Sequence, residues 1–163
     1  MDPPRRRDVN KSPTYRSWMK LYISDITASL QSLSPAFASE STFFLNGNSH
    51  HPVRWIYIIG TITCIDEQHD KKIIFTIDDG SGQSINAVAR RDRITTKNMP
   101  PLHSTVKAKG ELELYHDAWR LNLKSLDLDI PFEAQVKFWN EANENHAHLL
   151  LEKTDARKRP KHA

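Results

Sequence analysis

The chain has 163 residues, of which 38% are hydrophobic, and a formal net charge of +3. This is enough for one compact domain with a core of its own. The single cysteine, Cys64, excludes an intramolecular disulfide and a cysteine-based metal cage, and it favours a reducing, intracellular compartment. No apolar run is long enough to span a bilayer or to resemble a signal peptide, so we expect neither membrane insertion nor secretion.

The positive charge is concentrated at the two ends of the chain. Residues 1–20 hold six Lys or Arg and two Asp, and residues 152–163 hold five Lys or Arg, Glu152 and Asp155. Since these ends contribute +4 and +3 to a total of +3, the residues between them sum to −4. Non-specific phosphate binding needs clustered cations, so we expect the globular part to bind nucleic acid only modestly on its own. The basic run at 157–161 fits a solvated tail, a nuclear-import patch or a linker.

The N-terminal third combines tails and loops with one ambiguous segment. Residues 1–17 are expected to be a disordered basic tail. Residues 16–30 mix strand and helix signals, and we interpret them as a strap that leads into the domain. Residues 34–49 are rich in Ser, Pro and Asn and end in Asn46-Gly47, which is typical of a loop closed by a turn.

The central part of the chain is dominated by strand patterns. Apolar residues alternate with polar ones in several segments, and a glycine inside the first of them, Gly60, is typical of a bulge or sharp bend at a barrel corner. The predicted strands are Val53–Asp66, Lys72–Asp78, Ser84–Ala89, Ser104–Tyr115 and Ala118–Leu128.

A run of two carboxylates and two glycines, Asp78-Asp79-Gly80-Ser81-Gly82, separates the second and third of these strands. Successive side chains on a strand point to opposite faces, so Asp78 and Asp79 are poorly placed to share a proton or a metal ion as a catalytic dyad would. Glycine tolerates positive φ, and Asp bonds its own backbone in turns. We therefore interpret this segment as a hairpin turn.

The connection at 90–101, before the fourth strand, is too short for more than a turn or two of helix. A helix is predicted after the last strand, because Pro131 is favourable at the first position of a helix. A stripe at 3.6-residue spacing contains Phe132, Val136, Trp139 and Asn143, with Ala142 and His146 alongside. Five strands with a glycine bend in the first, followed by a helix, predict a mainly β protein. Its fold class is a five-stranded OB-fold barrel with an N-terminal strap and a C-terminal helix.

Several segments in order carry a resemblance to a known family: KLYISDI at 20–26, FFLNG at 43–47, HPVRWIYIIGTI at 51–62, FTIDDGSG at 75–82, VKAKGEL at 106–112 and a Pro-initiated helix containing FW. Together they resemble the N-terminal OB domain of the Stn subunit of the telomeric CST complex, which is related to the middle subunit of replication protein A. The resemblance implies an OB-fold domain at 18–148. It also implies that 149–163 is a basic tail or linker toward C-terminal domains.

The resemblance implies a non-catalytic protein of the nucleus, located at the chromosome end. Its partners would be the Ten-type small OB-fold subunit in a heterodimer, the large third CST subunit, single-stranded telomeric DNA and DNA polymerase α-primase. Its function would be telomere capping, end protection and assistance to C-strand fill-in. By position, the partner-facing residues implied are Asp78, Phe132, Val136, Trp139 and Asn143. The helix stripe could instead plug its own barrel, which leaves two interpretations open.

Nucleic acid on an OB barrel lies across the second and third strands and the loops beside them. This location predicts cations for phosphates and aromatic rings for bases among the following residues: Lys71, Lys72, Arg90, Arg91, Tyr115 and Trp119. Trp119 could instead pack in its hairpin, and the two arginines could simply face solvent. Asp66, Glu67 and Asp70 oppose phosphate binding, so binding should be weak alone and stronger with the partner.

Other chemistry has little support in the sequence. His50 and His51 are adjacent rather than at metal-ligand spacing, and neither a phosphate-binding loop nor a nucleophile elbow is present. We therefore expect no enzyme activity, no metal and no cofactor. Two rival interpretations remain: a general single-strand binding module like the middle subunit of replication protein A, and an OB interaction domain that does not bind nucleic acid.

Overall fold

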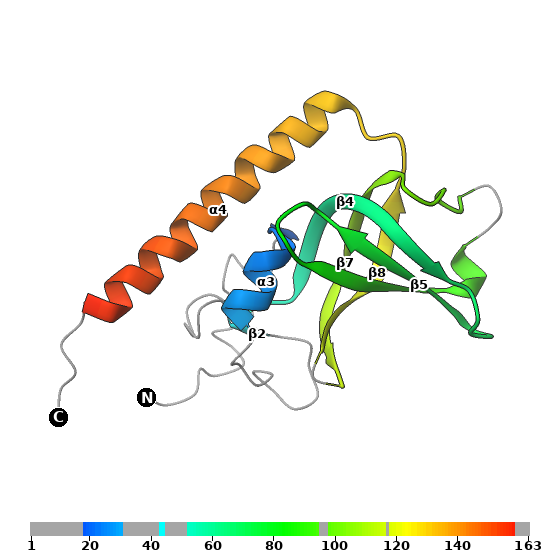
Figure 1. The fold of residues 1–163 in the computed structure, drawn as a ribbon, viewed down its shortest axis with the longest axis horizontal. Coiled ribbons are helices and arrows are strands. Elements are labelled where there is room, and N and C mark those ends of the chain that lie inside the picture. The colour runs from blue at the N-terminus through cyan, green and yellow to red at the C-terminus, as the bar shows by residue number, and fades with distance from the viewer. Residues whose placement is uncertain (1–17, 31–42, 45–51, 95–97, 117, 159–163) are drawn as a thin grey trace.

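The computed structural model describes residues 18–30, 43–44, 52–94, 98–116 and 118–158 (Figure 1). The elements in chain order are β1 (Trp18–Lys20), α3 (Ile23–Leu30), β2 (Phe43–Phe44), β3 (Pro52–Val53), β4 (Trp55–Asp66), β5 (Lys72–Asp78), β6 (Ser84–Arg90), the 3-10 helix η2 (Arg91–Arg93), β7 (Thr105–Tyr115), β8 (Ala118–Asp127) and α4 (Phe132–Lys158). The predicted tail at 1–17 and the Asn46-Gly47 turn lie outside the described residues.

Five strands close into a barrel. The sheet order is β1-β4-β5-β6-β8-β7, and an additional β4–β7 pairing joins the two sides. β4 makes this closure possible because its first half pairs with β7, from Trp55 to Thr61, and its second half pairs with β5, from Thr61 to Asp66. The five-stranded barrel predicted from the alternation of apolar residues is confirmed.

Gly60 lies where β4 changes partners. A Cβ at this position would meet Ile77 Cγ2 at 2.7 Å and the carbonyl oxygen of Asp78 at 2.8 Å. β5 therefore approaches the backbone of β4 more closely than any side chain would allow. The register of the β4–β5 pairing shifts just after this position, between Ile62 and Cys64. The strand bend expected from the glycine is found at this corner.

The barrel interior is filled by one face of each strand. Ile56, Ile58 and Ile62 of β4 point inward, and the residues between the first of them, Tyr57 and Ile59, point outward and are buried beneath α4. The same cluster is completed by Ile73, Phe75, Ile77, Ile85, Ala87, Ala89, Val106, Ala108, Leu112, Leu121 and Leu123.

The predicted strap consists of a short strand and a short helix. β1 adds to the barrel by pairing in parallel with β4, with Trp18 opposite Trp55 and Lys20 opposite Tyr57. The α3 helix follows, and its Ile23 and Ile26 are buried in the same core cluster as the barrel strands. The strap therefore belongs to the folded domain.

α4 packs along one side of the barrel, beside α3 and β4 (Figure 1). Phe138 and Ala142 are buried against Tyr57 and Ile59 of β4, and Leu149 is buried in the main core. The predicted stripe of Phe132 and Val136 is exposed, so the interpretation that this stripe plugs its own barrel is wrong for these two residues. The helix also continues to Lys158, so the predicted domain end at 148 falls inside it, and much of the segment expected to be a tail is helical.

Candidate functional site

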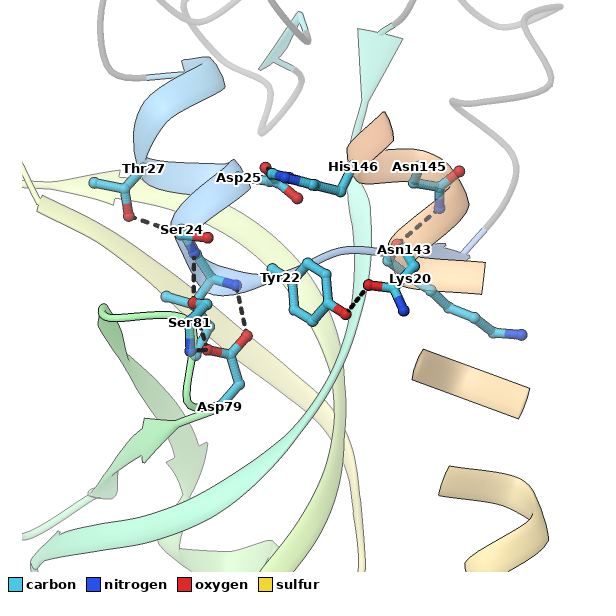
Figure 2. A network of polar contacts seen from close by, with 11 residues as sticks. Lys20, Tyr22, Ser24, Asp25, Thr27, Asp79, Ser81, Asn143, Asn145 and His146 are labelled. Carbon is cyan, nitrogen blue, oxygen red and sulfur yellow. Dashed lines mark hydrogen bonds and ion pairs between the residues drawn. The ribbon is translucent and has the colours of Figure 1, made fainter. Parts of the chain in front are cut away.

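The turn between β5 and β6 holds the first turn of α3 (Figure 2). The Asp79 carboxylate accepts hydrogen bonds from the Ile23 backbone N–H at 2.7 Å and from the Ser81 N–H at 3.0 Å. The Ser81 hydroxyl donates to the same carboxylate at 2.6 Å and accepts from the Ser24 N–H at 3.0 Å. The first N–H groups of a helix have no partner inside it. Asp79 and Ser81 therefore act as a helix cap supplied from a different part of the chain.

The two neighbouring carboxylates do different things. Asp78 is exposed, and its Oδ1 accepts from the Gly80 N–H at 2.8 Å within the turn. Asp79 is half-buried and reaches α3 instead. The pair is therefore not arranged as a catalytic dyad, and the hairpin-turn interpretation agrees with the geometry. Gly80 and Gly82 have φ of 80° and 95°, the left-handed conformations that this turn requires.

Polar and aromatic contacts fasten α4 to the strap. The Tyr22 ring stacks on Trp139, with centroids 5.7 Å apart. The Tyr22 hydroxyl donates a hydrogen bond to the Asn143 side-chain oxygen (Figure 2). The Asn145 amide donates to the Lys20 carbonyl at 2.8 Å. His146 Nδ1 lies 2.7 Å from Oδ1 of Asp25, a buried carboxylate of α3. These contacts fix the orientation of α4 on the barrel.

The side of α4 next to these contacts presents apolar side chains to solvent. Phe132 is 77% exposed and Val136 is 40% exposed. They line an open hollow of about 460 Å³, completed by Glu133, Lys137, Asn140 and Glu141. Trp139 is half-buried against Tyr22, and Asn143 is exposed apart from its bond to the Tyr22 hydroxyl. We call Phe132, Val136, Trp139 and Asn143 the outer face of α4.

Cations and an aromatic ring gather on the outward side of β5, β6 and β8 and at the end of β7, which holds Tyr115. Lys72 of β5 lies opposite Arg90 of β6. Tyr115, 47% exposed, has the Arg120 guanidinium carbon 3.8 Å from its ring centroid and the Lys72 ammonium 5.9 Å away. We call Lys72, Arg90, Tyr115 and Arg120 the β5–β6 face. Arg120 was missed in the sequence analysis, although its position next to inward-facing Leu121 predicts that it points outward.

Three other predicted nucleic-acid residues do not belong to this face. The Arg91 side chain donates to the His69 carbonyl at 2.7 Å and to the Glu67 carbonyl, so it braces the β4–β5 connection. Trp119 lies on the inward side of β8 with Leu121 and packs against the core. Lys71 is exposed in the β4–β5 connection, and its carbonyl accepts from the Arg91 N–H at 2.9 Å. Among the predicted residues, the structure thus brings together Lys72, Arg90 and Tyr115.

Two side chains near these surfaces have shifted pKa values. Burial, followed by the carboxylates of Asp79 and Asp25, raises the pKa of the Tyr22 phenol above its usual value. The backbone N–H of Gln68, followed by His69 and Lys72, lowers the pKa of the exposed Asp66 carboxyl. Within the described residues, no three His, Cys, Asp or Glu side chains are grouped to hold a metal ion. None of the helices in that part of the chain has the length and apolar content of a transmembrane span.

The closed barrel in the order β4-β5-β6-β8-β7 defines the class of the protein: it is an OB-fold. A model of the family described as telomere regulation protein Stn1 matches residues 6–156. The chain therefore belongs to the Stn1 family of telomere regulation proteins. This confirms the resemblance noted in the sequence, and the family is one of regulatory proteins.

Solved structures share the fold. A chain of the S. pombe Stn1–Ten1 complex superposes with a TM-score of 0.67 at 23% identity, covering 86% of this chain and 98% of that one. A chain of yeast Stn1 and Ten1 gives 0.69 at 18% identity, covering 89% and 80%. A chain of a replication protein A heterotrimer bound to single-stranded DNA gives 0.65 at 15% identity, covering 82% and 98%. No curated protein sequence matches this chain.

Proposed function

We propose that this chain is the Stn-type subunit of a telomere-capping complex in the nucleus. In this proposal the outer face of α4 binds a Ten-type small OB-fold subunit, and the β5–β6 face contributes to binding single-stranded telomeric DNA. The observation that carries the proposal is the exposed Phe132 and Val136 on a helix of a chain that belongs to the Stn1 family.

The heterodimer is supported by the arrangement of α4. Exposed apolar side chains that gather on one helix face mark interaction sites more often than isolated ones do. The Tyr22 stack and the Asn145 hydrogen bond hold α4 in place, so a partner would not have to order it on binding. Two solved complexes with this barrel contain Stn1 together with Ten1, which supports a partner of that class.

Asp78 is also part of the proposed interface. Its carboxylate is exposed. The adjacent Asp79 caps α3, and Tyr22, the residue before α3, contacts α4. A partner that covers the outer face of α4 and extends across α3 would therefore reach Asp78. Its contact there would be a hydrogen bond or ion pair rather than chemistry.

Binding of single-stranded DNA is supported by the chemistry of the β5–β6 face. Cations on such a face follow phosphates, and an exposed ring stacks on a base. Lys72, Arg90 and Arg120 supply the charge, and Tyr115 supplies the ring. The pairs Arg90–Asp92, at 2.7 Å, and Arg120–Glu113 reduce that charge, so we expect weak binding by this chain alone and tighter binding in the heterodimer.

The wider assembly follows from the same proposal. A large third CST subunit and DNA polymerase α-primase would join the heterodimer, which would protect the chromosome end and assist C-strand fill-in. Three of the predicted DNA-binding residues lie outside the β5–β6 face: Lys71, Arg91 and Trp119. They would contact DNA where the strand extends beyond that face. The rival functions are a general single-strand binding module and an OB domain that binds protein alone.

The heterodimer is tested by co-expressing this chain with the Ten-type subunit of the same genome and measuring association by light scattering and calorimetry. Truncating an apolar anchor at an interface costs roughly 2–4 kcal/mol, so Phe132→Ala with Val136→Ala should weaken association at least about 30-fold. Leu102→Ala is the matched control, because Leu102 is 49% exposed but lies in the β6–β7 connection.

Trp139→Ala gives a second, distinguishable readout. Because Trp139 also stacks on Tyr22, its removal should lower both the association constant and the stability of the isolated chain. A complex that forms equally well with all three substitutions would contradict an interface on the outer face of α4. Failure of the unmodified chain to bind a Ten-type subunit would favour the rival functions.

A further inference from the structure

A second surface combines aromatic rings with cations on the other flank of the barrel. It lies on the outward side of β1, β4 and the middle of β7, whereas the β5–β6 face uses β5, β6, β8 and the last residue of β7, Tyr115. The strand register places Trp18 beside Trp55, and Trp55 in turn beside Glu111. In the next row, Tyr57 lies between Lys20 and Lys109.

The rings and cations of this surface are in direct contact. The centroids of Trp18 and Trp55 are 5.1 Å apart, with the planes tilted by 52°. The Arg54 guanidinium carbon lies 4.7 Å from the Trp55 ring centroid, and the Lys109 ammonium lies 5.5 Å from that of Trp18. We call Trp18, Arg54, Trp55 and Lys109 the tryptophan patch.

The tryptophan patch is left uncovered by α4. Phe138 of α4 covers Tyr57, with ring centroids 4.9 Å apart, and buries Ile59 with it. One row closer to the start of β4, Trp18 remains 38% exposed and Trp55 half-buried. Two adjacent, partly exposed indole rings offer apolar faces on which a flat ligand can stack.

The charge of the patch selects an anionic ligand. Arg54 lies 3.3 Å from Glu111, which offsets one positive charge. Two neighbouring lysines, Lys20 and Lys107, pair with Glu141 and Asp127. The contacts described for Lys109 are to the rings of Trp18 and Tyr57, and among the described residues no carboxylate pairs with it. An ammonium beside an exposed indole is suited to a phosphate next to a stacked base.

We infer that the tryptophan patch is a second binding site for single-stranded DNA, in which a base stacks on Trp18 and the adjacent phosphate contacts Lys109. The inference rests on the proposed function, because it requires the chain to be a single-strand binder. An acidic peptide would satisfy Lys109 but would not use the flat faces of two adjacent indoles. A long strand would thus contact the barrel on two flanks.

The test uses the full chain with the Ten-type subunit and a fluorescein-labelled 18-nucleotide single strand, followed by fluorescence anisotropy at several salt concentrations. Trp18→Ala should weaken binding about tenfold, and Trp18→Phe, which keeps a ring, should lose much less. Lys109→Gln should reduce the slope of log K against log salt by about 0.7, the value for one phosphate contact on a single strand. Tyr115→Ala on the β5–β6 face should leave residual binding that Trp18→Ala then removes.

A second measurement does not depend on substitution. Strands containing 5-iodouracil cross-link to aromatic side chains in ultraviolet light, and mass spectrometry of the peptides should identify Trp18 in addition to Tyr115. Normal binding by Trp18→Ala and Lys109→Gln, with cross-links to Tyr115 alone, would overturn the second site and leave the proposed function standing. No DNA binding by the unmodified complex would overturn both. Loss of Ten-type association in Trp18→Ala, with DNA binding unchanged, would assign the patch to protein contact instead.

Discussion

The pair Asp78 and Asp79 offers a matched test of how the strap is held on the barrel. Both are aspartates of the same turn, but Asp79 accepts from the Ile23 N–H at 2.7 Å, whereas Asp78 accepts, among the described residues, from the Gly80 N–H within the turn. Removal of Asp79 leaves the N–H of Ile23, a residue that is 1% exposed, without its acceptor. An unpaired buried donor is costly, and we therefore expect very different effects from the two substitutions.

The expected loss in the free energy of unfolding follows from the hydrogen bonds that each substitution removes. Replacing a helix cap by Ala costs about 0.5–2 kcal/mol, and hydrogen bonds to a charged group are worth about 1.5–3 kcal/mol. Asp79→Ala loses the α3 cap together with both bonds from Ser81, so its expected cost is about 2–3 kcal/mol. For a chain of this size that corresponds to a fall in melting temperature of about 4–12 °C. Asp78→Ala should cost about 0.5 kcal/mol or less, because its carboxylate is exposed.

Urea unfolding followed by circular dichroism measures both values on the same scale. Hydrogen exchange adds a local readout. The exchange rates of the α3 amides should rise in Asp79→Ala and stay unchanged in Asp78→Ala. Equal destabilisation by the two substitutions, or unchanged exchange in α3, would refute the reasoning that the turn caps the strap.

Two further predictions concern backbone approach and pH. A Cβ at Gly110 would lie 2.4 Å from the Asn122 carbonyl oxygen, so Gly110→Ala should destabilise the barrel by about 3 kcal/mol or more in thermal melts. In contrast, a Cβ at Gly80 would have no atom within 4 Å, so Gly80→Ala should cost only about 1 kcal/mol, because of the positive φ at this position. A similar cost of Gly80→Ala and Gly110→Ala would argue against the close approach of β8 to Gly110. The raised pKa of Tyr22 means that the unfolded chain loses this proton first, so its stabilising contribution is complete below about pH 10 and is lost as the pH rises through the folded-state pKa. Tyr22→Phe should therefore show a shallower fall in the free energy of unfolding between about pH 9 and 11 by urea titration, and an unchanged slope would exclude this linkage.

The barrel could be predicted because its information is local. In strands such as Lys72–Asp78, every second side chain is apolar, and the alternation alone defines the buried face. Gly60 and the glycines of the β5–β6 turn added the bend and the hairpin. The same alternation in β8 places Trp119 inward, with Leu121, and Arg120 outward.

The features that sequence did not predict depend on distant partners. α4 carries apolar residues on more than one side, and the buried stripe of Phe138, Ala142 and Leu149 has the same helical spacing as the exposed one. Only the presence of Tyr57 and Ile59 beneath α4 selects between them. The α3 helix has Tyr22 where a local capping residue would stand, so its start could not be recognised from its own sequence. Arg91 likewise pairs with carbonyl groups 22 and 24 positions away.

The distance along the chain between the strap and its supports has a consequence for folding order. The strap lies at residues 18–30, yet its cap comes from 56 residues further on and its contacts with α4 from 121 to 125 residues further on. Closing loops of this length precedes any gain from the contacts, and the strap helix is too short to persist alone. During synthesis, residues 18–30 would therefore emerge first and reach their native conformation last, after α4 has left the ribosome. The outer face of α4 would acquire its fixed orientation in the same step, so that assembly with a partner subunit reports on completion of the domain.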